Sequence, residues 1–212
     1  MKIEHLGHSS FQITNRSTLV IDPYGPEIGR LPQGLTADVV TVSHQHFDHN
    51  YSDGVSGNPV IIDEPGQYSV KGFEIKGFKT FHDDKGGTIR GENIVFCISA
   101  DDLNLCHMGD LGHILTDEQV KEIGPVDILM IPVGGFYTID ASQAVQVVRQ
   151  INPKIVMPMH YKPPGSPLQL TIESTDNFNK LLGWDVIERT DEFEINSLNI
   201  DSFNKTIMLF KK

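Results

Sequence analysis

Cysteine is scarce in this 212-residue sequence, which contains only Cys97 and Cys106. Two cysteines cannot build the disulfide framework that stabilises small secreted domains. Both lie in apolar stretches, where a free thiol usually behaves as a small buried hydrophobic side chain. We therefore expect two free thiols rather than a disulfide.

Long hydrophobic runs are also missing. The longest apolar stretches, such as 94–98 and 128–133, are far shorter than the roughly 20 residues that a membrane-spanning helix needs. The N-terminal segment MKIEHLGHSSF lacks the apolar stretch and cleavage site of a secretory signal. We expect a cytoplasmic protein without a membrane partner.

Basic residues are few: 17 lysines and arginines face 28 acidic residues, for a net charge of −11. This balance argues against a nucleic-acid binder with a broad basic surface. The sequence also has neither a Gly-x-Ser-x-Gly nucleophile elbow nor a phosphate-binding P-loop, which excludes the corresponding hydrolases and nucleotide-binding proteins. A small-molecule partner is the remaining expectation.

What the sequence does have is enough apolar material for a packed core. Apolar residues make up 39% of the chain, and a chain of this length buries roughly 70% of its unfolded surface. We predict one domain over residues 1–212. The sequence does not specify its oligomeric state.

The first half of the chain alternates short apolar runs with turn residues, a pattern typical of β-strands. We predict strands at 2–6, 10–14, 18–21, 38–43, 59–62, 67–70 and 73–81.

The second half mixes helices and strands. Thr116 has the character of a helix N-cap and Gly124-Pro125 that of a stop, so we predict a helix between them. Apolar runs at 126–133 and 155–159 flank an amphipathic helix at 140–151. A last helix at 172–182 and strands at 184–187, 193–195 and 206–210 close the chain. These elements indicate an α/β sandwich of two sheets packed face to face with helices outside.

Three histidines and an aspartate fall within six residues directly after the apolar strand at 38–43. They are His44, His46, Asp48 and His49. Imidazole and carboxylate groups suit zinc, and a loop leaving a strand can direct closely spaced side chains to one point. His44 and His46 can share one metal, while Asp48 and His49 can face a second.

The segment His44-Gln45-His46-Phe47-Asp48-His49 resembles the HxHxDH signature of the metallo-β-lactamase superfamily of binuclear metal hydrolases. That resemblance implies an αββα sandwich of two mixed sheets flanked by helices. Further motifs of the superfamily have candidates in the same order along the chain, each where an apolar run stops. They are Asp22, His82, Asp110 and His160.

The resemblance implies a role for each of these residues. One metal would be bound by His44, His46 and His82. A second would be bound by Asp48, His49 and His160. Asp110 would bridge the two, with Asp48 and Asp110 also taking part in catalysis, and Asp22 would orient ligands without binding metal.

One ligand has a competitor. His107 stands three residues before Asp110 and could take the place of His82. Side chains alternate along a strand, so His107 should point away from the face shared by Cys106, Met108 and Asp110. We therefore favour His82. His5 and His8 lie in the first turn, and nothing in their spacing requires a ligand role.

The implied activity is hydrolysis by two ions, zinc or else manganese, with a bridging hydroxide that attacks a small ester, lactone or phosphodiester. Neutral histidines, two carboxylates, two dications and one hydroxide sum to a local charge of about +1, which favours an anionic substrate. Lys162 could bind such a group, although an exposed lysine is the simpler expectation. The surroundings of Asp110 and His160 resemble those of ascorbate-6-phosphate lactonase-like proteins.

Three other functions stay open. A nuclease of the same superfamily is disfavoured because the chain has no basic arm. A di-iron redox protein is disfavoured because His46 stands where that branch usually has a glutamate. A non-catalytic metal-binding protein is disfavoured by the full ligand set.

Overall fold

The computed structural model describes residues 1–163, 171–190 and 192–210. Within them, six strands form an N-terminal sheet in the order β13-β1-β2-β3-β4-β5. The sheet is mixed, because β3, β4 and β5 are parallel and the other pairs are antiparallel. Its strands are β1 (Lys2–Gly7), β2 (Ser10–Thr14), β3 (Thr18–Ile21), β4 (Val39–Thr41), β5 (Val60–Ile62) and β13 (Glu192–Glu194).

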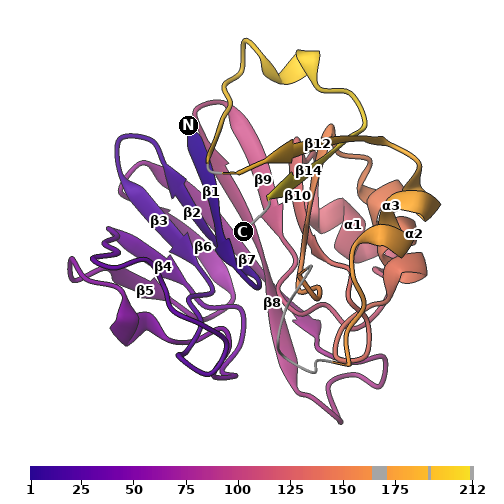
Figure 1. The fold of residues 1–212 in the computed structure, drawn as a ribbon. Helices are drawn as coiled ribbons and strands as arrows, with labels where there is room; N and C mark the ends of the chain where they lie inside the picture. The colour runs from indigo at the N-terminus through magenta and orange to yellow at the C-terminus, as the bar shows by residue number, and fades with distance from the viewer. Residues whose placement is uncertain (164–170, 191, 211–212) are drawn as a thin grey trace.

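A second mixed sheet has the order β12-β14-β11-β10-β9-β8-β7-β6 and is parallel from β12 to β9. Its strands are β6 (Gly66–Val70), β7 (Phe73–Phe81), β8 (Glu92–Ala100), β9 (Leu103–His107), β10 (Ile128–Pro132), β11 (Ile155–Met159), β12 (Asp185–Arg189) and β14 (Thr206–Phe210). Figure 1 shows it between the N-terminal sheet and the helices.

Three α-helices cover the outer face of the second sheet: α1 (Asp117–Ile123), α2 (Ala141–Ile151) and α3 (Asp176–Leu182). Two short 3₁₀ helices, η1 (Ser52–Gly54) and η2 (Ile200–Ser202), lie in connections. The predicted start of α1 is confirmed: Thr116 accepts a hydrogen bond from the Gln119 N–H, and the Gln119 side chain accepts one from the Thr116 N–H. Asp140 and Gln143 cap α2 in the same way.

The third helix begins later than predicted. Residues 172–175 are not helical because their backbone bonds to neighbouring loops. The Glu173 N–H donates to the Gly134 carbonyl, and the Glu173 carbonyl accepts from the Lys162 N–H. These long-range hydrogen bonds replace the first helical turn. No local sequence pattern indicates them.

Strand alternation builds two core layers. In β3, Leu19 and Ile21 face the second sheet, whereas Val20 faces outward. In the second sheet, Leu105 and Met130 meet the first sheet, and the alternating positions meet the helices. The central strands are buried on both faces, which is why they read as continuous apolar runs.

The predicted sandwich of two mixed sheets with helices outside is confirmed, with one difference. Among the described residues, all three α-helices pack on the second sheet. The outer face of the N-terminal sheet is instead covered by connections, whose Tyr24, Leu35 and Val55 are buried against Val20 and Val40. A few short apolar segments suffice to cover this smaller face.

Cys97 and Cys106 are free thiols, as expected, and lie opposite each other on β8 and β9 with their sulfur atoms 3.6 Å apart. Cys106 packs in the layer between sheet and helices. In the described part of the chain, no helix is long and apolar enough to span a membrane.

Strands from both sheets end at one edge of the sandwich. Residue 22 follows β3, residues 43–50 follow β4, residue 82 follows β7, residues 108–110 follow β9 and residue 160 follows β11. Loops at such an edge are where α/β proteins commonly build sites. The fold therefore gathers the predicted ligands, although they are spread over most of the sequence.

Candidate metal centre

The seven predicted metal ligands lie together at this edge, in three groups whose nitrogen and oxygen atoms lie within 4.8 Å of one another. One group is His44, His46 and His82. The second is His8, Asp48, His49 and His160. The third is His44, His49 and Asp110. The first two groups match the two predicted ligand sets, with His8 added to the second.

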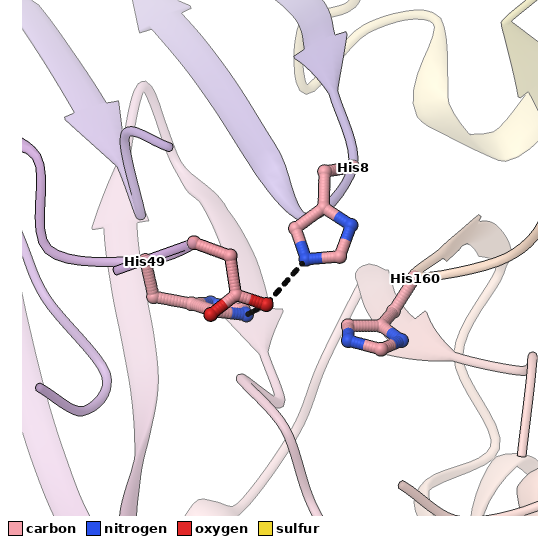
Figure 2. A group of neighbouring side chains, drawn as sticks. His8, His49 and His160 are labelled. Carbon is pink, nitrogen blue, oxygen red and sulfur yellow. Dashed lines mark hydrogen bonds and ion pairs between the residues drawn. The ribbon is translucent and has the colours of Figure 1, made fainter. Parts of the chain in front are cut away.

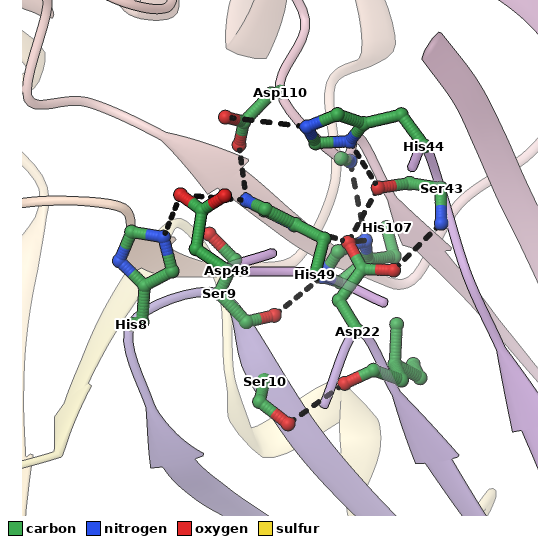
Figure 3. Close-up of polar contacts among 12 residues, drawn as sticks. His8, Ser9, Ser10, Asp22, Ser43, His44, Asp48, His49, His107 and Asp110 are labelled. Carbon is green, nitrogen blue, oxygen red and sulfur yellow. Dashed lines mark hydrogen bonds and ion pairs between the residues drawn. The ribbon is translucent and has the colours of Figure 1, made fainter. Parts of the chain in front are cut away.

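Asp110 stands between the two sets. Its Oδ2 lies 3.1 Å from Nε2 of His82 and 3.2 Å from Nε2 of His160. Its Oδ1 lies 3.2 Å from Nε2 of His49, and its Oδ2 lies 4.0 Å from Nε2 of His44 (Figure 3). A carboxylate that touches histidines of both sets has the position that a bridging ligand requires.

The second set is assembled from both sheets. Figure 2 shows His8, His49 and His160 around one space, each carried by a different segment. The Nε2 of His8 donates to Oδ2 of Asp48 over 3.1 Å, and the His8 ring centre lies 4.4 Å from that of His160. His8 therefore belongs to the site, although nothing in its sequence spacing required a ligand role.

Asp22 lies behind the ligands and fixes the tautomers of two of them. Its Oδ2 accepts a 2.8 Å hydrogen bond from Nδ1 of His49, which leaves the Nε2 lone pair of His49 facing Asp110. The same Oδ2 accepts a 2.6 Å bond from the Ser43 hydroxyl, and that oxygen in turn accepts from Nδ1 of His44 over 3.0 Å. Hydrogen bonds of this kind orient metal-binding histidines and raise their basicity.

His107 takes no part in these groups. Its Nε2 donates to the Ser9 carbonyl over 2.8 Å, and its Nδ1 accepts from the Gly109 N–H over 3.1 Å. Both ring nitrogens are thus engaged by backbone, and the side chain is fully buried. His82 instead points its Nε2 at Asp110, in line with the alternation argument.

The backbone before Asp110 has room only for glycine. Gly109 has a φ of +54°, and a β-carbon there would collide with the side chains of Asn93 and Ser43. The Asn93 amide donates to the Met108 carbonyl over 2.9 Å, while its oxygen accepts from the Asp110 N–H over 2.9 Å. Asn93 therefore holds the turn that presents Asp110.

Two of the site residues themselves adopt left-handed backbone conformations. Asp22 has a φ of +45° and His160 has a φ of +50°. Such conformations cost about 1–3 kcal/mol each and persist where the surroundings hold them, which is common at functional sites. Gly134 contributes to this packing, because a β-carbon on it would collide with the His160 carbonyl.

The electrostatics keep Asp110 charged and favour the neutral form of His8 and His44. Burial raises the pKa of Asp110, but His160 and His49 outweigh it and hold the pKa well below its ordinary value. Burial lowers the pKa of His44 to about 3 and that of His8 to about 4. The imidazole lone pairs are therefore free to bind a cation at neutral pH.

His49 behaves differently. Burial lowers its pKa, but contacts with Asp110 and Asp22 outweigh burial and raise the pKa well above the ordinary value. In the protein alone, Nε2 of His49 thus attracts a proton. A metal ion at the same atom would displace that proton, which is the usual coupling of metal binding to proton release.

The donor set fits divalent metal ions. Nε2 of His44 is buried, yet it has no hydrogen-bond partner. Buried polar atoms without partners are rare and call for an explanation, such as a ligand or ion. Imidazole nitrogens combined with carboxylate oxygens are ligands typical of zinc and other transition metals.

A cavity of about 610 Å³ opens over these groups. Its floor includes His46, Asp48, His82, Asp110 and His160. Its walls include the apolar residues Ile28, Phe47 and Ile172 together with Tyr137 and Arg90. The volume is in the range of pockets that bind small molecules.

Sequence patterns missed four residues at or beside this site: His8, Asp83, Arg90 and Asn93. Asp83, Arg90 and Asn93 carry no motif spacing, and they approach the site only through long-range folding. His8 had a local signal, because it follows Gly7 at the end of the first strand, but a single histidine in a turn is a weak indication.

Known proteins match this chain closely. A model of the beta-lactamase superfamily domain matches residues 2–160. A crystal structure from Thermotoga maritima, described as a candidate Zn-dependent hydrolase of the metallo-beta-lactamase superfamily, is 38% identical. It covers 100% of this chain and 99% of its own, with a TM-score of 0.81.

Sequence relatives agree with this match. A UPF0173 metal-dependent hydrolase from Thermococcus onnurineus is 27% identical over 86% of this chain and 92% of its own length. A relative of the same description from Nanoarchaeum equitans is 31% identical over 76% of this chain and 84% of its own length.

Proposed function

Because the chain belongs to the metallo-β-lactamase superfamily and is a metal-dependent hydrolase, we propose that it uses two divalent ions to hydrolyse its substrate. The ions are zinc or manganese, and the substrate is a small ester, lactone or phosphodiester. The observation that carries the proposal is the position of Asp110 between two separate groups of histidines. One group contains His82, and the other contains His49 and His160. A two-ion centre needs this kind of shared carboxylate.

His44, His46 and His82 would hold the first ion, and Asp48, His49 and His160 would hold the second. Asp110 would serve both. When bound at these residues, divalent ions would lower the pKa of bound water to about 7 and would polarise the scissile carbonyl or phosphoryl group.

Residues of the chain orient the histidine ligands and supply negative charge to the site. Asp22 fixes the tautomers of His44, through Ser43, and of His49 directly, so that each keeps its Nε2 lone pair for metal. The side chain of Asp48 is 18% exposed, and Asp48 lines the cavity. Its carboxylate can therefore orient a water molecule in the cavity.

The size of the cavity favours a small-molecule substrate. Apolar walls from Ile28, Phe47 and Ile172 favour a substrate with an aliphatic or aromatic portion. Because those walls exclude water, electrostatic interactions between a substrate and the polar floor become stronger. A long polymer such as RNA would need a positively charged binding surface, and the net charge of −11 argues against such a surface.

Hydrolysis of a three-member panel tests this proposal: 4-nitrophenyl acetate, δ-valerolactone and bis(4-nitrophenyl) phosphate. The zinc- or manganese-loaded protein is compared with Asp110→Asn and with Leu198→Ala, a control at a 94% exposed position. We expect turnover of at least one class, a loss of about 100-fold or more in Asp110→Asn, and no change in the control. Full activity after chelation, or in Asp110→Asn, would refute the two-ion centre.

A further inference from the structure

One cation faces the cavity. Among the described residues that line it, Arg90 alone is a lysine or arginine. Lys162, which follows His160 by two positions in the sequence, does not line it. Lys79 lies on the neighbouring strand edge and is paired with Glu92. Arg90 is therefore the side chain whose charge a ligand in this cavity would meet.

Two contacts hold the Arg90 side chain over the site. Its Nη2 donates a 3.0 Å hydrogen bond to the Phe136 carbonyl. Its guanidinium carbon lies 5.8 Å from the centre of the Tyr137 ring, within reach of a cation–π interaction. Arg90 thus joins the loop after β7 to the loop after β10. Because its side chain is already held in place, binding a ligand costs less side-chain entropy.

The backbone of Arg90 is also held. The Asp83 carboxylate accepts hydrogen bonds from the N–H groups of Lys85, Gly87, Ile89 and Arg90, at 2.8–2.9 Å. A backbone bond from His82 to the Gly91 carbonyl closes the same loop at its base. His82 and Arg90 therefore stand at the two ends of one loop that Asp83 ties together.

The guanidinium has no carboxylate partner in the described residues. None of the ion pairs found there includes Arg90. An arginine fork offers five N–H donors, and the bond to Phe136 uses one of them. The remaining donors match the geometry of a carboxylate or phosphate group, which arginine binds in a bidentate manner.

We propose that Arg90 binds a carboxylate or phosphate group on the substrate, away from the bond that is cleaved. The inference rests on the proposed hydrolytic function and names its substrate class: a small ester, lactone or phosphodiester with a separate anionic group. The apolar walls, including Phe47 and Tyr137, contact the part of the substrate between the anion and the scissile bond.

A matched pair of esters tests this specificity. Mono-4-nitrophenyl glutarate carries a carboxylate, and 4-nitrophenyl valerate is its neutral counterpart of similar length. In the metal-loaded parent we expect a higher kcat/KM for the glutarate ester. In Arg90→Gln we expect that preference to fall about 10- to 100-fold, mainly through KM, because a hydrogen bond to a charged group is worth about 1.5–3 kcal/mol.

Two variants separate recognition from support of the loop. Arg16→Gln removes an exposed arginine from the turn between β2 and β3 and should keep the preference of the parent. Arg90→Lys should recover only part of it, since lysine lacks the planar fork. If Arg90 merely supports the Phe136 segment, both esters lose activity equally in Arg90→Gln, and the proposal is wrong.

A binding measurement keeps the inference independent of turnover. Glutarate and phenyl phosphate are titrated into chelated protein and followed by ¹H–¹⁵N NMR, with valeramide as the neutral control. We expect both anions to bind at least about tenfold more weakly to Arg90→Gln than to the parent. Equal affinities overturn the role of Arg90, whereas Arg90-dependent binding without hydrolysis of any ester places the failure in the proposed function.

Discussion

At the scale of single residues, the site depends on side chains that bind no metal in the proposed scheme. Asp22 accepts hydrogen bonds from His49 and Ser43 and is fully buried. Burial raises the pKa of Asp22, but its contact with His49 outweighs burial and lowers it. The carboxylate is therefore charged at neutral pH, and its charge strengthens His49 as a ligand.

Replacing Asp22 with Asn should weaken metal binding. The amide keeps the size of the carboxylate but removes its charge and one acceptor, so the orientation of His49 loosens. We expect the affinity for Zn²⁺ to fall about 10- to 100-fold, measured by calorimetric titration of the chelated protein. Asp53→Asn, at an exposed position in η1, is the control. Unchanged affinity in Asp22→Asn would remove the orienting role.

Asp83 offers a pH-dependent prediction. Burial raises its pKa, but four backbone N–H donors, Arg90 first, outweigh it and hold the pKa at about 2. A depressed pKa contributes stability that is complete above the ordinary value of 3.8 and is lost as the pH falls toward 2. We expect the difference in Tm between chelated parent and Asp83→Asn to be constant from pH 7 to pH 5 and to shrink below pH 4.

Hydrogen exchange gives the local counterpart of that Tm difference. In Asp83→Asn, the amides of Ile89 and Arg90 should exchange faster than in the parent at pH 7, because their acceptor is weakened. Amides of β10 should keep their protection. Equal protection of Ile89 and Arg90 in the two proteins would show that Asp83 does not hold the loop.

At the scale of elements, the turns after the strands determine which side chains meet. The turn after β9 is the sharpest case, because Gly109 has a positive φ and no space for a β-carbon, while Asn93 fixes the next residue. An element of regular structure could not place Asp110 between ligands from both sheets.

Gly109→Ala should therefore lower the free energy of unfolding by more than the strain of a positive φ alone would. Gly183 is a matched control, since its φ of +69° and ψ of +23° are left-handed and a β-carbon there has open space. We expect Gly183→Ala to lose about 1–2 kcal/mol of unfolding free energy and to keep its metal. Gly109→Ala should lose more and bind less metal, measured by denaturant unfolding and metal analysis. Equal losses would mean that the close packing around Gly109 is unimportant.

The sequence predicted elements well wherever the signal is local. The Thr116 cap, the amphipathic pattern of α2 and the strand Phe73–Phe81 all depend on neighbours in sequence. The predicted start of α3 was wrong because Glu173, within residues 172–175, forms long-range backbone hydrogen bonds with Gly134 and Lys162. A local pattern contains no information about such partners.

The candidate site follows the same division. His44, His46, Asp48 and His49 are recognisable because they are adjacent in the sequence. His82, Asp110 and His160 were assigned through the resemblance to the superfamily's later motifs, and each of them follows a strand at one sheet edge. Arg90 and Asn93 could not be found, since their approach to the site depends on how β7, β8 and β9 pair.

At the scale of the whole molecule, the centre joins the two sheets. His44, His46, Asp48 and His49 follow β4 of the N-terminal sheet, whereas His82, Asp110 and His160 follow strands of the second sheet. Figure 3 shows His44, Asp48 and His49 of the first set close to Asp110 of the second. Bound ions would therefore link the halves of the sandwich as well as serve catalysis.

Removing the metal should accordingly destabilise the entire fold. A ligand present at 100 times its Kd stabilises a protein by about 2.7 kcal/mol. We expect chelation to lower the Tm of the parent. The free energy of unfolding should fall by about that amount for each ion that is bound at 100 times its Kd. The effect should be much smaller in Asp110→Asn. A chelator that leaves the Tm of the parent unchanged would contradict a metal link between the sheets.

The most direct test of the two-ion centre is metal stoichiometry by elemental mass spectrometry, on protein purified without added metal. The parent, His82→Ala, Asp110→Ala and His107→Ala are compared, with circular dichroism to establish that each is folded. Our account predicts two zinc or manganese ions per parent chain, fewer in His82→Ala and Asp110→Ala, and two in His107→Ala. A single ion in the parent, iron as the dominant metal, or a loss in His107→Ala but not in His82→Ala would contradict it.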